Sequence, residues 1–203
     1  HHVLRDPQLG VAEDMVVLGN GGDCCIRMAA SAFLNEGEEA VMADPSFPVY
    51  TAFTRIMGAR AVHVPLNDHA HDLRAMRRRI GRKTKLVFVC NPNNPTGTIV
   101  GRKELDAFVA GLPPRTILLL DEAYHEFVSD PEYPDGVRYV KEGRKVIVLR
   151  TFSKVYGLAG LRIGYTIADS SLSGALDRVR EPYVVSSISE VAAAAALDDA
   201  AFV

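Results

Sequence analysis

Short apolar runs alternate along the chain with longer stretches in which apolar residues recur at helical spacing. The apolar runs, which predict strands, are residues 15–18, 39–43, 61–64, 86–90, 117–120, 146–149 and 163–168. The predicted helices are residues 23–35, 48–57, 72–80 and 102–110, with an alanine-rich, helix-prone segment at 186–197. This alternation favours a largely parallel sheet covered by helices. The predicted fold class is therefore α/β, with a mostly parallel sheet flanked by helices.

The composition narrows the class of protein further. Hydrophobic residues make up 48% and charged residues 24% of the 203 residues, which are ordinary values for a globular chain. No apolar run reaches the roughly 18 residues that span a bilayer. The formal net charge is -2, and the basic run 77–79 near a helix end is typical of a solvent-facing surface. We expect a cytoplasmic protein with no nucleic-acid or membrane partner, and we set His1 and His2 aside as native or tag residues.

Cysteine and histidine positions argue against a metal site. Cys24, Cys25 and Cys90 show neither zinc-ligand spacing nor the even count of a disulfide framework, so reduced thiols are expected. Cys90 lies in an apolar run and is interpreted as a small core residue rather than a nucleophile. His69 and His71 invite a metal-binding interpretation, but neither thiols nor a second ligand cluster accompany them. We predict no metal.

A glycine-rich turn at residues 19–23 closes a predicted strand and opens a helix. The free amide groups of such a helix start can bind a phosphate. A dinucleotide-binding fingerprint is the alternative, because Asp44 lies near the expected distance of about 20 residues from the turn. Cys24 weakens this alternative, since it occupies the third-glycine position, where a side chain interferes with close helix packing. The fingerprint also explains none of the motifs that follow.

Two further strands end in polar residues. Residues 91–97, NPNNPTG, read either as a tight connection or as a binding loop, and three asparagines offer donors to a bound ring oxygen. Asp121 directly follows the run 117–120, where it either caps a helix or is poorly solvated. A buried carboxylate is costly unless it meets a cation such as a protonated pyridine nitrogen. Tyr124 adds a phenol nearby.

A lysine follows the run 146–149 in the segment RTFSK. Lys154 stands beside a hydroxyl and before three glycines, which is not typical of an ordinary exposed helix residue. Lysine amines form Schiff bases with aldehydes and act as nucleophiles and bases. Thr151, Ser153 and Arg162 supply the groups that a nearby phosphate needs.

Together these motifs resemble the fold-type I pyridoxal-phosphate enzymes. Within them the chain is similar to the class I/II aminotransferases, with the histidinol-phosphate aminotransferases as the nearest group. The strongest segments are residues 91–98 (NPNNPTGT), 121–127 (DEAYHEF) and 150–165 (RTFSKVYGLAGLRIGY), and the likeness extends from about residue 18 to 198. The resemblance implies pyridoxal 5'-phosphate as the cofactor, small amino-acid and oxo-acid substrates, and a homodimer.

The resemblance also implies roles for individual residues. Lys154 holds the cofactor as a Schiff base, and Asp121 pairs with the pyridine nitrogen. Asn94 and Tyr124 bond the phenolic oxygen of the ring, and Phe47 stacks on the ring. The implied catalytic residues are Lys154, Asp121 and Tyr124. The implied phosphate-binding positions are Gly22, Asp23, Thr151, Ser153 and Arg162.

The chain departs from the family pattern at a few positions. Residues 22–24 are Gly-Asp-Cys where close relatives carry Ser-Asp-Glu, and Val184 stands where they carry asparagine. The family's N-terminal segment and its small C-terminal domain, which carries the arginine for the substrate carboxylate, have no counterpart here. We therefore expect residues 1–203 to form one domain, an incomplete cofactor-binding large domain.

The activity that the resemblance implies is amino transfer between glutamate and a phosphorylated oxo-compound, with imidazole-acetol phosphate of histidine biosynthesis as the first candidate. An aromatic-amino-acid aminotransferase and a threonine-phosphate decarboxylase share the cofactor machinery and stay open. A non-catalytic pyridoxal-phosphate sensor or an inert fragment is an alternative of another class, although no DNA-binding module is visible in the sequence.

Overall fold

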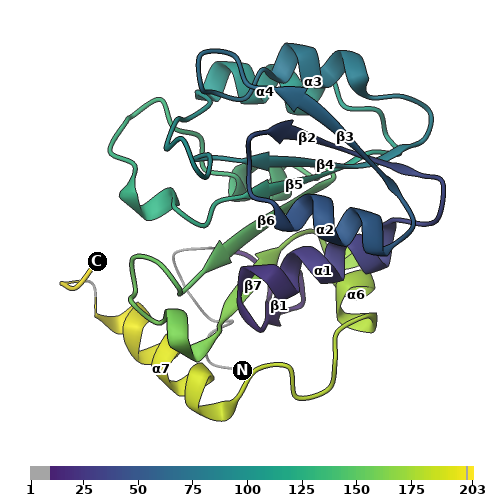
Figure 1. Cartoon of the computed structure of the whole chain (residues 1–203). Helices are drawn as coiled ribbons and strands as arrows, with labels where there is room; N and C mark the ends of the chain where they lie inside the picture. Colours follow the sequence, from purple (N-terminus) through teal and green to yellow (C-terminus); the bar gives the residue numbers. More distant parts are fainter. Residues whose placement is uncertain (1–9, 200) are drawn as a thin grey trace.

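One seven-stranded sheet forms the centre of the molecule. The structure, a computed structural model, describes residues 10–199 and 201–203, so His1 and His2 lie outside the described part. The strands are β1 Val16–Gly19, β2 Glu39–Asp44, β3 Arg60–Pro65, β4 Thr84–Cys90, β5 Ile117–Asp121, β6 Val146–Thr151 and β7 Gly164–Ile167. Their order in the sheet is β1-β7-β6-β5-β4-β2-β3 (Figure 1). The strands from β2 to β6 are parallel, and β7 runs antiparallel to both β6 and β1.

Helices connect the strands and cover both faces of the sheet. They are α1 Gly21–Phe33, α2 Val49–Ile56, α3 Leu73–Arg79, α4 Arg102–Ala110, α5 Val137–Lys141, α6 Ser170–Arg178 and α7 Ser187–Asp198. Short 3-10 helices occur at η2 Glu13–Met15, η3 His125–Phe127 and η4 Ala159–Leu161. No helix in the described part of the chain is long and apolar enough to cross a membrane. The sequence predicted every strand and every helix except α5, α6 and the 3-10 helices, with small shifts at the ends.

The boundary of α1 differs from its prediction in an informative way. The helix starts at Gly21 rather than near Asp23. Gly21 has a φ of +75°, which a residue without a Cβ adopts readily. The glycine-rich turn is therefore part of the first helical turn, and the helix start lies closer to the strand than the apolar pattern indicated.

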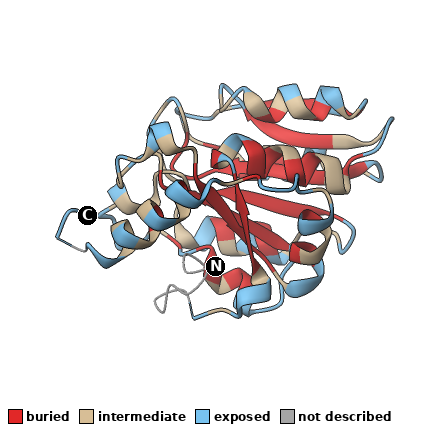
Figure 2. Ribbon diagram, turned by 90° about the horizontal axis from the view of Figure 1, so that it is seen from below, coloured by how far each residue is buried: buried red, intermediate tan, exposed pale blue. Residues whose placement is uncertain are grey.

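Alternation along the strands divides the core into two layers. On β5, Leu118 and Leu120 pack with residues of α3, α4 and α5, whereas Ile117 and Leu119 pack with residues of α1, α2 and α6. Successive strand side chains point to opposite faces, so a strand that is apolar throughout is covered on both sides. Figure 2 shows the buried strands enclosed between helices with exposed outer faces.

The topology gathers several strand ends at one edge of the sheet. Because β7 is antiparallel to both of its neighbours, β1 runs in the same direction as β6. The carboxyl ends of β1, β2, β4, β5 and β6 therefore meet at the same edge. In open α/β sheets this edge is where ligands bind.

Candidate cofactor site

A cavity of about 210 Å³ lies at this edge of the sheet. Its lining includes every residue that the sequence assigned to cofactor binding: Gly22, Asp23, Phe47, Asn94, Asp121, Tyr124, Thr151, Ser153, Lys154 and Arg162. The lining also includes apolar residues and a thiol that the sequence did not assign: Ile26, Cys90, Ala123, Leu149 and Ala159. The four polar junctions, which are far apart along the chain, thus come together around one space.

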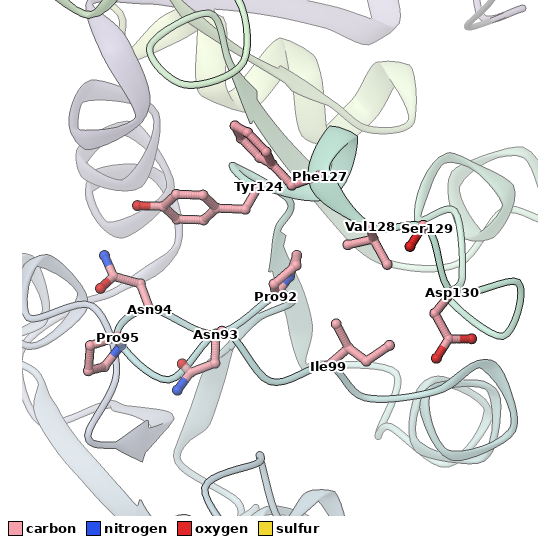
Figure 3. A pocket seen from close by; sticks show the side chains of 11 residues that line it. Pro92, Asn93, Asn94, Pro95, Ile99, Tyr124, Phe127, Val128, Ser129 and Asp130 are labelled. Atoms are coloured by element: carbon pink, nitrogen blue, oxygen red, sulfur yellow. The ribbon is translucent and has the colours of Figure 1, made fainter. Parts of the chain in front are cut away.

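Lys154, Tyr124 and Asn94 form one side of this cavity. Lys154 follows β6 and is exposed, with its Nζ 5.1 Å from the centroid of the Tyr124 ring. Asn94 and Tyr124 also line a second cavity of about 530 Å³, which extends past Phe127 and the loop that follows it. The hydroxyl of Tyr124 and the amide of Asn94 lie on the same side of that second cavity (Figure 3). An amine and two neutral hydrogen-bonding groups are therefore available at the boundary between the two spaces.

Asp121 ends β5 and is almost fully buried, with 4% of its surface exposed. Its Oδ2 accepts a hydrogen bond from the Tyr50 hydroxyl at 2.6 Å, and its Oδ1 accepts one from the Ala123 N–H at 3.0 Å. Burial raises the pKa of Asp121, while both hydrogen bonds act in the opposite direction. Neither donor carries a positive charge, so this carboxylate is suited to a cationic partner inside the cavity.

The start of α1 offers anion-binding groups to the other side of the cavity. The side chain of Asn20, which precedes the helix, does not cap it and instead donates to the Val184 carbonyl at 3.1 Å. Uncapped amide groups at a helix start bind phosphate readily. Arg162, whose Nη2 lies 3.7 Å from Oδ2 of Asp23, adds a guanidinium beside this helix start.

Two hydroxyl groups lie at the end of β6, close to Lys154. The Ser153 N–H donates to Oγ1 of Thr151 at 3.1 Å, and the two hydroxyl oxygens are 2.9 Å apart. Thr151 is buried and Ser153 is half-buried. With the guanidinium of Arg162 and the start of α1, these hydroxyls form a set of donors that suits a phosphate dianion.

Gly164 is required by the close approach of β7 to the start of α1. A Cβ at this position would lie 2.9 Å from the carbonyl carbon of Gly21 and 3.0 Å from the backbone nitrogen of Gly22. We expect Gly164→Ala to lower the free energy of unfolding by about 1–3 kcal/mol. The added methyl group would meet backbone atoms of Gly21 and Gly22, which cannot move aside as a flexible side chain could. Chemical denaturation measures this loss.

Gly174→Ala is the matched control for Gly164→Ala. Gly174 lies in α6, and a Cβ built there meets no atom within 4 Å. Alanine in a helix interior is favoured over glycine by about 0.5–1 kcal/mol, so this variant should be slightly more stable than the parent. Equal stability changes in the two variants would contradict the role of Gly164 in packing the helix start.

The histidines considered as metal ligands have other environments. His71 is buried, its Nε2 lies 3.0 Å from Oδ1 of Asn93, and burial lowers its pKa to about 4. The same Asn93 oxygen accepts from the Ser46 hydroxyl at 2.9 Å. His69 is exposed. Among residues 10–199 and 201–203, no three His, Cys, Asp or Glu side chains cluster as a metal site.

Cys90 is a core residue, as its apolar surroundings indicated. It is 2% exposed, and its Sγ donates to the Pro92 carbonyl at 3.2 Å. Burial raises the pKa of the Cys90 thiol to about 12, so it stays neutral at physiological pH. The thiol therefore contributes to the wall of the cavity without charge.

Comparison with known proteins identifies the family of the chain. The family model described as aminotransferase class I and II matches residues 1–203. The chain belongs to this family. Among curated relatives, it is 50% identical over 197 residues to the histidinol-phosphate aminotransferase of Moorella thermoacetica, covering 97% of the chain and 51% of the relative. The chain spans about half the length of the curated relatives it matches.

Two solved structures of related sequence show the same fold. The histidinol-phosphate aminotransferase of Sinorhizobium meliloti, in complex with pyridoxal-5'-phosphate, superimposes with a TM-score of 0.92 at 33% identity, covering 98% of the chain and 55% of that structure. The L-threonine-O-3-phosphate decarboxylase of Porphyromonas gingivalis superimposes with a TM-score of 0.84 at 25% identity, covering 99% and 61%. The fold class expected from the sequence is therefore confirmed.

At two positions where the sequence departs from the aminotransferase family pattern, the structure shows a buried side chain. Cys24 is buried in the first turn of α1, with Nη2 of Arg27 3.7 Å from its sulfur. Val184 is buried, and its carbonyl accepts the hydrogen bond from Asn20.

Tyr50, which donates to Asp121, is a polar contact of the site that the sequence did not indicate. A tyrosine in an apolar helical stretch resembles an ordinary core residue.

Proposed function

We propose that the protein is a pyridoxal-phosphate-dependent aminotransferase that moves an amino group between glutamate and a phosphorylated oxo-compound. The first candidate for that compound is imidazole-acetol phosphate of histidine biosynthesis. The observation that supports the cofactor is the single cavity lined by all the residues that the family pattern assigned to it. The substrate assignment is supported by the 50% identity to a histidinol-phosphate aminotransferase.

The residues around the cavity fit pyridoxal phosphate chemically. The buried carboxylate of Asp121 has two neutral donors and suits the protonated nitrogen of a pyridine ring. The exposed amine of Lys154 suits an aldehyde. The uncapped start of α1, Arg162 and the hydroxyls of Thr151 and Ser153 suit the phosphate.

Bound pyridoxal phosphate supplies an aldehyde that combines with amines and a ring that accepts electrons from the substrate Cα. Within this site, Lys154 would hold the cofactor through its Nζ, and the same amine, once free, would accept the proton from the substrate Cα. Asp121 would keep the ring nitrogen protonated through its negative charge. Asn94 and Tyr124 would donate hydrogen bonds to the phenolic oxygen, and Phe47 would cover the ring.

A second candidate function is decarboxylation of threonine phosphate. It is favoured by the similarity to the Porphyromonas gingivalis decarboxylase, which extends over nearly the whole chain. Both candidate substrates carry a phosphate, and the same cofactor residues serve both reactions. The aromatic-amino-acid aminotransferase is a third outcome that the same assay separates.

The test is an assay that offers all three substrates. Because the chain spans about half the length of its relatives, two proteins are compared: the 203-residue chain, and this chain joined to the remaining segments of the Moorella thermoacetica relative. Each is incubated with pyridoxal phosphate and 2-oxoglutarate, together with histidinol phosphate, phenylalanine or threonine phosphate. Glutamate formed mainly from histidinol phosphate supports the first proposal, and release of carbon dioxide from threonine phosphate supports the second.

The same assay distinguishes the non-catalytic alternatives. Cofactor retention without turnover of any substrate in either protein points to a sensor domain. Loss of both retention and turnover points to an inert fragment.

We further propose a homodimer in the reducing cytoplasm. Apolar side chains of Ile188 and Val191 on α7 are exposed and offer surface to a second copy. The cysteines Cys24, Cys25 and Cys90 are free and buried, which suits a reducing compartment. Light scattering coupled to size-exclusion chromatography measures the oligomeric state, and a monodisperse monomer of the extended protein would contradict the dimer.

A further inference from the structure

Tyr50 is a fully buried tyrosine of α2 whose hydroxyl points at the acid of the candidate site. Its side chain is 1% exposed, and its hydroxyl donates to Oδ2 of Asp121 at 2.6 Å. The ring of Tyr50 stacks on Phe88 with the centroids 4.8 Å apart and the planes at 13°. Phe47 meets the same ring edge to face, with the centroids 5.7 Å apart. Contacts with two aromatic rings therefore restrict the direction of the hydroxyl.

The carboxylate of Asp121 is held at two points. Each of its oxygens has its own donor, since Oδ1 accepts from the Ala123 N–H and Oδ2 from the Tyr50 hydroxyl. The backbone donor lies two residues along the chain, whereas Tyr50 comes from a helix on the face of the sheet. Removing the hydroxyl of Tyr50 leaves the carboxylate with one donor and free to rotate about its side-chain bonds.

The charges around Asp121 make this donor more important. Burial raises the pKa of Asp121, and the hydrogen bond from Tyr50 lowers it. Burial, followed by the charge of Asp121, raises the pKa of Tyr50, so the proton of this pair stays on the phenol. The titratable groups that act on Asp121 from the surrounding elements are Asp23 of α1, Tyr50 of α2 and Lys154. The charge of Asp121 in turn raises the pKa of Cys25, Cys90 and Tyr133.

We propose that Tyr50 is a positioning residue, which holds the Asp121 carboxylate in one orientation and in its ionised form for the ring nitrogen of the cofactor. This inference rests on the proposed function. It links two parts of the site, because the ring of Tyr50 also packs against Phe47, the residue expected to cover the cofactor ring. The start of α2 would then determine the orientation of both Asp121 and Phe47.

The first test uses the chain without cofactor and the variant Tyr50→Phe, which keeps the stacked ring and removes the hydroxyl. The carboxyl carbon of Asp121, labelled with 13C, is titrated by NMR. We expect the pKa of Asp121 to rise by about one unit in the variant, because a hydrogen bond to a charged group is lost. An unchanged titration would overturn the proposal.

Tyr139→Phe is the matched control in this titration. Tyr139 is also 1% exposed, and its hydroxyl donates to an aspartate, Asp106, at 2.7 Å. Asp106 belongs to α4, which packs on the opposite face of the sheet. This control also removes the hydrogen bond of a buried phenol to an aspartate, and it should leave the Asp121 titration unchanged. A shift of equal size in both variants would show that general loosening, and not the Tyr50 hydroxyl, moves the pKa.

The second test measures how fast pyridoxal phosphate leaves the protein. We expect release from Tyr50→Phe to be about ten-fold faster than from the parent. In an Asp121→Asn background the same substitution should change the rate less than two-fold, because its effect depends on the carboxylate. Equal acceleration in both backgrounds would mean that Tyr50 acts through packing alone, and the proposal would fall.

The two tests separate this proposal from the proposed function. If the parent chain retains no pyridoxal phosphate at Lys154, the proposed function fails, and with it the part of the inference that concerns the cofactor. The titration without cofactor still decides whether Tyr50 controls Asp121. Normal retention by the parent with no effect of Tyr50→Phe in either test overturns the inference alone.

Discussion

Replacing Lys154 by alanine is expected to abolish the covalent attachment of pyridoxal phosphate to the chain. Lys154 lines the cavity with its amine near Tyr124, and the family pattern places the Schiff base there. An amine held beside a bound aldehyde reacts at an effective concentration far above that of lysines in solution. The amount of cofactor trapped by borohydride should therefore fall on the order of 100-fold or more. Mass spectrometry of the peptide that contains residue 154 measures the trapped adduct.

Lys103→Ala is the control for this experiment. Lys103 is an exposed residue of α4, and this helix packs on the face of the sheet opposite to α1 and α2. Trapping in this variant should match the parent. If Lys154→Ala keeps the same borohydride-reducible chromophore, another amine carries the cofactor and the assignment of Lys154 is wrong.

Most of the fold was predictable from the sequence because its strands are apolar on both faces. A strand such as β5, which packs between two layers of helices, leaves a continuous apolar run in the sequence. The direction of β7 was not predictable, since a buried strand has the same pattern whether it is parallel or antiparallel. The helices α5 and α6 were missed because α5 has only five residues and α6 is largely polar. The capping of α6 by Asp169 was the available signal.

The candidate site was predictable for a different reason. Most of its assigned residues lie at the carboxyl ends of strands or in the loops that follow them, so the shared direction of those strands brings them to one edge. The supporting contacts follow no such rule. Tyr50 lies 71 residues before Asp121 and inside a helix, so nothing local in the sequence reveals that they meet. Glu122 and Arg150 are likewise 28 residues apart, and only the pairing of β5 with β6 brings them together.

Arg150→Met is expected to destabilise the folded chain by about 3–5 kcal/mol at pH 8, because it leaves a buried carboxylate without its cation. Arg150 donates to Oε2 of Glu122 through Nε at 3.0 Å and through Nη2 at 2.8 Å. The side chains are 10% and 1% exposed. The other oxygen of Glu122 accepts from the Gly136 N–H at 2.7 Å. Since the free energy of unfolding of natural domains is about 5–15 kcal/mol, this loss is a large fraction of the total stability.

The loss should depend on pH in a defined direction. Burial raises the pKa of Glu122 to about 7, above the ordinary value of 4.5, while Arg150 acts in the opposite direction. A carboxyl group with a raised folded-state pKa contributes its stability below the unfolded pKa, and this contribution disappears as the pH rises through the folded pKa. Removing Arg150 raises the folded pKa of Glu122 further, so Arg150→Met should be less destabilised at pH 5 than at pH 8. Urea denaturation at the two pH values measures the difference.

Two further variants test the cause of this loss. Arg138→Met breaks a partly exposed ion pair with Asp106 and should cost about 1 kcal/mol or less. Glu122→Gln combined with Arg150→Met removes the buried charge as well as its partner. The destabilisation of this double variant relative to the parent should therefore no longer be larger at pH 8 than at pH 5. If Arg150→Met alone is no more sensitive to pH than the parent, the charge of Glu122 is not what Arg150 compensates.

The position of this pair explains why its loss concerns the site as well as the stability. Glu122 directly follows Asp121 at the end of β5, and Arg150 directly precedes Thr151 at the end of β6. The ion pair therefore joins the two strand ends that carry the proposed ring-nitrogen acid and a proposed phosphate ligand. We expect pyridoxal phosphate to leave the Arg150→Met variant faster than it leaves Arg138→Met when the two variants are compared at equal free energy of unfolding. Equal release rates would assign the pair to stability alone.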